Sequence, residues 1–190
     1  YPDQEALTFS GVSYSEIKGN TLTSSCIKEG ICCKYNCNNC TIAYNNLATP
    51  DVSIYIGASY GGYAHDFWVY GNYCHGTGNS ISIGMETCGL IENFYIFNNI
   101  FASDVHGFQF IDEMTAGSCS TGPKNVYFIN NVCNVGNSAF KINPITTQTY
   151  MRNVVIRNNI LKGDESSIFI SANQPMNQLT IDHNFFLGTA

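Results

Sequence analysis

The stretch NFYIFNNIF, Asn93 to Phe101, decides the fold of this chain. Apolar residues stand at alternate positions along it, a pair of asparagines follows, and an apolar residue comes two places after the second asparagine. Alternation with a period of two, in a short run bounded by Gly, Asn, Ser and Pro, is typical of a β-strand. The stretch is therefore predicted to be a strand with one buried face that ends in a polar pair.

The same template recurs along nearly the whole chain. The clearest copies are Asp66 to Cys74, Asn93 to Phe101, Asn125 to Cys133, Asn153 to Leu161 and Gln178 to Phe186, and two weaker copies are Tyr14 to Leu22 and Cys40 to Ala48. We call the asparagine that ends each polar pair the marker. The markers recur every 25 to 32 residues, at Asn20, Asn46, Asn72, Asn99, Asn131, Asn159 and Asn184. A period of this length is typical of repeat architectures.

A second strand is predicted after each marker. Apolar residues stand nine and eleven places beyond it, at Ile81 and Ile83, Phe108 and Phe110, Phe140 and Ile142, and Ile168 and Ile170; in the second repeat Ile54 and Ile56 come one place early. A unit of about 26 residues with two or three short strands cannot bury its own apolar side, so the units must stack on one another. No segment is left for a helix of normal length.

At this point the chain resembles the pectate-lyase-like superfamily of right-handed parallel β-helices, whose repeats read NVxIxNNxI followed by GIxI. The resemblance runs from about Leu7 to Leu187. It implies an all-β, single-stranded right-handed parallel β-helix of about seven coils, each of 25 to 32 residues, in one domain over residues 1–190. The superfamily contains polysaccharide lyases and hydrolases, tailspikes, adhesins and structural surface proteins, so the fold does not determine the function.

A β-helix explains the composition, because the chain has 23 Asn against only 8 Lys plus Arg. Coils roughly 4.8 Å apart would stack the markers, so that their amides hydrogen-bond along the axis as a ladder. Two places after each marker the side chains should point inward, at Leu22, Ala48, Cys74, Phe101, Cys133, Leu161 and Phe186. Cys74 and Cys133 would lie two coils apart, too far for a disulfide, and are predicted to be buried apolar residues.

The net charge of −6 disfavours nucleic-acid binding, and no apolar run approaches the length of a membrane span. Nine cysteines indicate a secreted protein with disulfides. Because the sequence opens with Tyr1, we expect a mature or excised part of a secreted precursor. Its expected partners are copies of itself, other β-helix subunits, or an extracellular polysaccharide.

Seven cysteines are candidates for disulfides. Cys88 and Cys119 fall in corresponding turns of adjacent coils, which makes a bridge between them plausible. Five more crowd around the second coil: Cys26, Cys32, Cys33, Cys37 and Cys40. We expect disulfides here; zinc is the alternative, because Cys37 and Cys40 form a CxxC pair, but the second CxxC of a zinc ribbon is absent. Asn39 begins a sequon and is a glycosylation candidate.

One patch suits acid-base chemistry. Glu86 and Glu113 both stand fourteen residues after their markers, so they should stack on adjacent coils, with Asp112 beside one of them and Lys141 one coil further on. Stacked carboxylates of this kind raise one pKa or bind Ca²⁺. An enzyme acting on polysaccharides would use these four residues as its catalytic set, whereas the alternative is a set of solvated acids at strand ends.

The outward face is rich in aromatic residues. Four places before each marker stand Ile42, Trp68, Tyr95, Tyr127 and Val155, and two places before it stand Tyr44, Tyr70, Phe97 and Ile129. An apolar stripe several coils long exceeds what a monomer normally exposes, and predicts a contact surface. It is covered by another part of a longer protein, by a second subunit, or by stacked sugar rings.

Two functions follow from these features. The chain is predicted to be an extracellular structural protein that self-associates through its aromatic face and end to end, because the part-coils at its two ends look complementary. The alternative is a polysaccharide lyase, a glycoside hydrolase or a carbohydrate-binding module, with the aromatic residues as sugar platforms.

Overall fold

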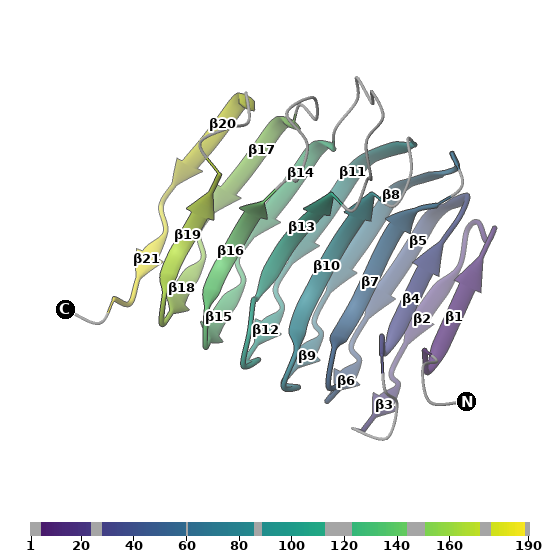
Figure 1. Cartoon of the computed structure of the whole chain (residues 1–190), viewed down its shortest axis with the longest axis horizontal. Helices are drawn as coiled ribbons and strands as arrows, with labels where there is room; N and C mark the ends of the chain where they lie inside the picture. The colour runs from purple at the N-terminus through teal and green to yellow at the C-terminus, as the bar shows by residue number, and fades with distance from the viewer. Residues whose placement is uncertain are drawn as a thin grey trace.

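The computed structural model describes residues 5–23, 28–59, 61–85, 89–112, 123–143, 151–171 and 176–188. Of Asp112 and Asn143 it describes the backbone only. The chain winds as a right-handed parallel β-helix, in which every coil adds one strand to each of three seven-stranded parallel sheets (Figure 1). The predicted fold class is confirmed, and the number of coils is close to the predicted seven. Among the described residues no helix is long and apolar enough to cross a membrane.

Each sheet runs along the whole axis, and we name the three sheets A, B and C. Sheet A contains β1 (Leu7–Ser10), β4 (Ile31–Lys34), β7 (Val52–Ala58), β10 (Asn79–Met85), β13 (Phe108–Asp112), β16 (Ser138–Asn143) and β19 (Ser166–Ile170). Sheet B contains β2 (Glu16–Lys18), β5 (Cys37–Ala43), β8 (Tyr63–Tyr70), β11 (Leu90–Phe97), β14 (Lys124–Ile129), β17 (Met151–Arg157) and β20 (Met176–Asp182). Sheet C contains the short strands β3 (Thr21–Leu22), β6 (Asn46–Leu47), β9 (Tyr73–Cys74), β12 (Ile100–Phe101), β15 (Val132–Val135), β18 (Ile160–Gly163) and β21 (Phe185–Phe186).

The alternating residues build the core as expected. The inward side chains of adjacent coils stack in register, for example Ile83 on Phe110 and Phe110 on Ile142 in sheet A. In sheet B the rings of Phe67 and Phe94 stack with centroids 5.5 Å apart. Removing this apolar surface from water at about 25 cal/mol per Å² is the main stabilising contribution to the fold.

Cys74 and Cys133 lie in this core as thiols, as predicted. Burial raises the pKa of Cys74 to about 12 and raises the pKa of Cys133 as well. Both side chains therefore behave as small apolar residues and not as nucleophiles.

The asparagine ladder is present, with one correction to the predicted positions. Each marker side chain donates to the Oδ1 of the next one, as between Asn72 and Asn99 at 3.0 Å, and its Oδ1 also accepts the backbone N–H of the preceding marker. In the second coil the ladder residue is Asn45 and not Asn46, since Asn20 donates to Asn45 and Asn45 to Asn72. The ladder therefore runs through Asn20, Asn45, Asn72, Asn99, Asn131, Asn159 and Asn184.

This one-residue shift corrects the neighbours of Asn46 too. Leu47, and not Ala48, is the inward residue that pairs with Cys74, and Ile42 is fully buried instead of facing outward. Counted from Asn45, Ile54 and Ile56 come at the regular nine and eleven residues.

The residue before each ladder asparagine explains why the repeat contains a polar pair. This residue has a positive φ in every coil: Gly19, Tyr44, Gly71, Asn98, Asn130, Asn158 and His183. Glycine and asparagine tolerate the left-handed conformation best, so the first residue of the pair makes the turn and the second makes the ladder. Tyr44 therefore stands in a turn, 64% exposed, and not on the strand face where it was predicted.

Candidate functional site

A row of side chains runs along the outer face of sheet A. The strand register places Tyr55, Ser82, Gln109, Lys141 and Phe169 at the same position of successive coils. Their neighbours along each strand point into the core, so these five point away from it. Tyr55 and Ser82 are buried, whereas Gln109 and Lys141 are half-buried and Phe169 is exposed. The accessible part of the row thus offers an amide, an ammonium group and an aromatic ring.

Lys141 lies at a small pocket in this row. The pocket has a volume of about 150 Å³ and is lined by Ser138, Lys141, Glu165 and Phe169. The Nζ of Lys141 lies 6.0 Å from the centre of the Phe169 ring, within the range of a cation–π contact. The same Nζ lies 2.9 Å from the Nε2 of His106.

His106 is a buried base beside this lysine. Its Nδ1 accepts the backbone N–H of Ser138 at 3.1 Å. Burial, with the positive charge of Lys141 as a second cause, lowers the pKa of His106 to about 4, so the ring is neutral at pH 7. With Nδ1 accepting, the ring proton sits on Nε2, which then faces Lys141 as a donor. Nε2 therefore does not satisfy the ammonium group, and an anionic group entering the pocket would.

The depressed pKa of His106 predicts a pH-dependent stability. Between the ordinary pKa of 6.5 and about 4, the unfolded chain binds a proton that the folded chain does not, so stability falls as the pH falls through this window. We expect the free energy of unfolding, measured by urea denaturation, to be about 2 kcal/mol lower at pH 5 than at pH 7. His106→Gln should lose most of this dependence, whereas His183→Asn, at an exposed turn, should retain it. An equal pH dependence in the parent and His106→Gln would contradict the assignment.

Only one of the four predicted catalytic side chains is described in the structure. Lys141 is in the pocket, but Glu86 and Glu113 lie outside the described residues. The backbone of Asp112 pairs with Met85 at the end of β13, on the same sheet as Lys141. The grouping of these three acids with Lys141, and a Ca²⁺ ion held by them, remain predictions.

His106 was not recognised as part of the site from the sequence, although a signal was present. His106 and Ser138 both stand seven residues after their markers, and Gln109 and Lys141 both stand ten residues after theirs. Residues with equal offsets occupy stacked positions on adjacent coils. The offsets therefore predict that His106 lies beside Ser138 and that Gln109 lies beside Lys141, as in the structure.

The second candidate site is the aromatic face of sheet B. One outward row contains Thr41, Trp68, Tyr95, Tyr127 and Val155, and the next contains Ala43, Tyr70, Phe97, Ile129 and Arg157. Between these rows lies a groove of about 380 Å³, lined by Trp68, Tyr95, Phe97, Tyr127, Ile129 and Asn130. Tyr44 joins the face from its turn, with its ring edge-on to Tyr70 at 5.3 Å.

The rings of this face are stacked on one another. Tyr95 is parallel to Trp68 within 11° and to Tyr127 within 3°, with centroids 5.8 and 5.1 Å apart, and Tyr70 stacks on Phe97 at 5.0 Å. Their faces are therefore largely occupied by neighbouring rings, and mainly edges and hydroxyl groups face the solvent. A sugar that stacks needs a free ring face, so this geometry suits contact with protein side chains better than a sugar platform.

The cysteines around the second coil differ from the prediction. Cys33, Cys37 and Cys40 are buried thiols, so the expected disulfides among these three are not formed in the structure. The Sγ of Cys37 lies 3.2 Å from the carbonyl oxygen of Lys34, and that of Cys40 lies 3.2 Å from the carbonyl oxygen of Asn38. Burial raises the pKa of all three thiols.

The remaining predicted modification sites have mixed outcomes. Cys26, Cys88 and Cys119 lie outside the described residues, so their bridges remain predictions. Asn39 is half-buried, and its Nδ2 donates to the Oδ1 of Asn38 at 2.9 Å. Glycosylation at Asn39 would replace one of the two hydrogens on this Nδ2, and it too remains a prediction.

Comparison with known proteins identifies the architecture. No family model and no curated protein matches the sequence. The structure is similar to the crystal structure of a hyperthermoactive exopolygalacturonase from Thermotoga maritima, with a TM-score of 0.60 and 14% sequence identity. The match covers 96% of this chain and 54% of that enzyme, so this chain spans about half its length. This likeness shows the fold, a parallel β-helix.

Proposed function

We propose that this chain is an extracellular β-helix that binds an acidic polysaccharide along the outer face of sheet A, with Lys141 as the anchoring residue. The main support for the proposal is the pocket lined by Lys141, whose ammonium group also faces a neutral, buried His106. A carboxylate of a sugar acid would accept from both the ammonium group and the Nε2–H of His106. Charge-assisted hydrogen bonds of this kind are about twice as strong as neutral ones.

The row on sheet A also suits a polymer. Parallel coils repeat every roughly 4.8 Å, so Gln109, Lys141 and Phe169 present an amide, a cation and an apolar ring in succession along the axis. An extended sugar chain needs such a line of contacts, with a few polar groups that fix its orientation. The likeness to an exopolygalacturonase is consistent with this class of ligand.

Catalysis is the further step within this proposal. Asp112 ends β13 on the same sheet, and Glu86 and Glu113 belong to the segments that follow β10 and β13. If these acids reach the bound polymer, they supply the proton transfer that a glycoside hydrolase or a polysaccharide lyase needs. Binding requires none of them and is therefore tested separately.

The test is a panel of soluble polysaccharides of both charge classes, titrated into the purified chain in an isothermal calorimeter. We expect measurable binding to polygalacturonate, and binding at least tenfold weaker to an uncharged polymer such as arabinan. The affinity should fall as salt is added, because the Lys141 contact is ionic. Equal affinity for charged and uncharged polymers, or no binding to any of them, would contradict the proposal.

Self-association is a second candidate function, favoured by the apolar groove on sheet B. Apolar surface of this kind is covered in protein contacts, here by a second copy packed against the groove. Light scattering over a range of concentrations tests this candidate: the mass should rise above 20.9 kDa, and a constant monomer mass at high concentration would rule it out.

A further inference from the structure

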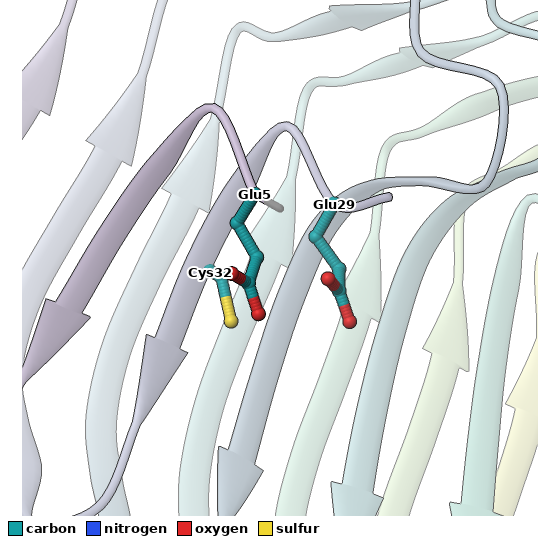
Figure 2. A group of neighbouring side chains, drawn as sticks. All are labelled: Glu5, Glu29 and Cys32. Atoms are coloured by element: carbon teal, nitrogen blue, oxygen red, sulfur yellow. The ribbon is translucent and has the colours of Figure 1, made fainter. Parts of the chain in front are cut away.

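Three ligand-type side chains meet at the N-terminal end of sheet A, away from both candidate sites described above. Glu5 precedes β1, Glu29 precedes β4, and Cys32 belongs to β4. One carboxylate oxygen of each glutamate and the Sγ of Cys32 all lie within 4.8 Å of one another. Figure 2 shows the three side chains extending toward the same side of the strands. Within the part of the chain that the structure describes, no other three such side chains come this close together.

The strand register creates this cluster. Leu7 pairs with Ile31, and the N–H of Ala6 donates to the carbonyl oxygen of Glu29, so Glu5 and Glu29 occupy equivalent positions on adjacent coils. Two carboxylates stacked in this way repel each other, which favours either a proton on one of them or a cation beside the pair.

Lys34 offsets only part of the repulsion between the two carboxylates. Its Nζ lies 3.4 Å from the Oε1 of Glu5 and 3.8 Å from the Oε1 of Glu29. The Glu5 backbone N–H, together with this lysine, lowers the pKa of the Glu5 carboxyl, so Glu5 is ionised at neutral pH.

The second carboxylate oxygen of Glu29 is the main evidence that this cluster binds a ligand. Glu29 is only 8% exposed, and its Oε2 is fully buried without a hydrogen-bond partner. A buried carboxylate oxygen without a hydrogen-bond partner destabilises the folded chain. Buried charges of this kind are normally paired or bound to a metal ion.

We propose that Glu5, Glu29 and Cys32 form a site for a divalent cation of the zinc class. Two carboxylates and one thiolate are ligands that Zn²⁺ accepts, and the thiolate disfavours the hard cations Ca²⁺ and Mg²⁺. Three protein ligands leave the fourth tetrahedral position for water. Binding releases the thiol proton to solvent, because the ligand is the thiolate, so affinity rises with pH.

The site also predicts a role for Lys34. Its ammonium group is near the same carboxylates, so it competes with the metal ion for them. The variant Lys34→Met should therefore bind Zn²⁺ several times more tightly than the parent. A structural ion pair without a metal site predicts instead that Lys34→Met is only less stable.

The test uses the full chain, stripped of metal, and titration with Zn²⁺ and with Co²⁺ as a spectroscopic substitute. We expect one ion per chain and, with Co²⁺, a thiolate-to-cobalt absorption band that is lost in Cys32→Ser. Glu29→Gln should weaken Zn²⁺ binding at least tenfold, and Glu5→Gln, at a more exposed position, provides the same test if Glu29→Gln does not fold. Glu16→Gln is the matched control, because this exposed carboxylate pairs with Lys18 at 2.8 Å and should leave Zn²⁺ binding unchanged.

Two results would overturn the proposal. The first is that Cys32→Ser and a folded Glu29→Gln or Glu5→Gln variant all bind Zn²⁺ with an affinity within twofold of the parent's. This result would mean an adventitious ion only. The second is a disulfide at Cys32, found by mass spectrometry of the alkylated protein. Neither result bears on polysaccharide binding, because its anchoring residue Lys141 lies four coils away on sheet A.

Discussion

Replacing Asn99 by alanine is expected to lower the free energy of unfolding by about 4 kcal/mol. Asn99 is 1% exposed and lies in the middle of the ladder. Its Oδ1 accepts the N–H and the Nδ2 of Asn72, and its Nδ2 donates to the carbonyl oxygen of Val69 at 2.9 Å. Alanine leaves these buried groups without their partners, and each such group costs about 1–3 kcal/mol.

The neighbouring residue provides a matched control for this prediction. Asn98 is exposed and holds a φ of 56° in the turn, a position that Gly71 occupies one coil earlier. Asn98→Gly should therefore change the stability by less than about 0.5 kcal/mol, as measured by urea denaturation followed by circular dichroism. If both variants lose the same free energy, the ladder does not stabilise the coils as described.

The repeat was predictable because every coil solves the same problem with the same residue types. The alternation places apolar side chains inside, and the near-constant period aligns the coils, so sheet topology and core follow from the sequence. The exception is the second coil, where Tyr44, Asn45 and Asn46 offer two possible alignments. Tyrosine at a left-handed turn position is uncommon, which favoured the wrong alignment, although the early positions of Ile54 and Ile56 indicated the right one.

The candidate site was less predictable, because its contacts depend on where side chains point between coils. The sequence predicted Lys141 as a cation one coil beyond a patch of acids, whereas the position of His106 beside it depends on a backbone N–H from Ser138. The stacking of Trp68, Tyr95 and Tyr127 on one another also could not be read from alternation, which gives the face of a strand but not the tilt of a ring. The thiols of the second coil differ from the expected bridges because a disulfide needs a specific Cβ geometry that spacing does not provide.

The second large expected effect concerns Lys141. In Lys141→Met the side chain keeps a similar length but loses the ammonium group, and with it the cation–π contact with Phe169. A hydrogen bond to a charged group is worth about 1.5–3 kcal/mol, so the affinity for an acidic polymer should fall at least about tenfold. The fold should persist, because Lys141 is only half-buried and points away from the core.

Lys124→Met is the matched control, since it removes the same charge from sheet B, where Lys124 pairs with Glu92. The net charge changes equally in the two variants, so a general electrostatic effect would weaken both to the same extent. If Lys141 itself contacts the polymer, only Lys141→Met should bind the polymer more weakly.

The dissociation constant of polygalacturonate for the parent, Lys141→Met and Lys124→Met, measured in one buffer, tests the central claim most directly. We predict that Lys141→Met binds at least tenfold more weakly while Lys124→Met stays within about twofold of the parent. Equal dissociation constants for the parent and Lys141→Met would contradict a polysaccharide site on sheet A.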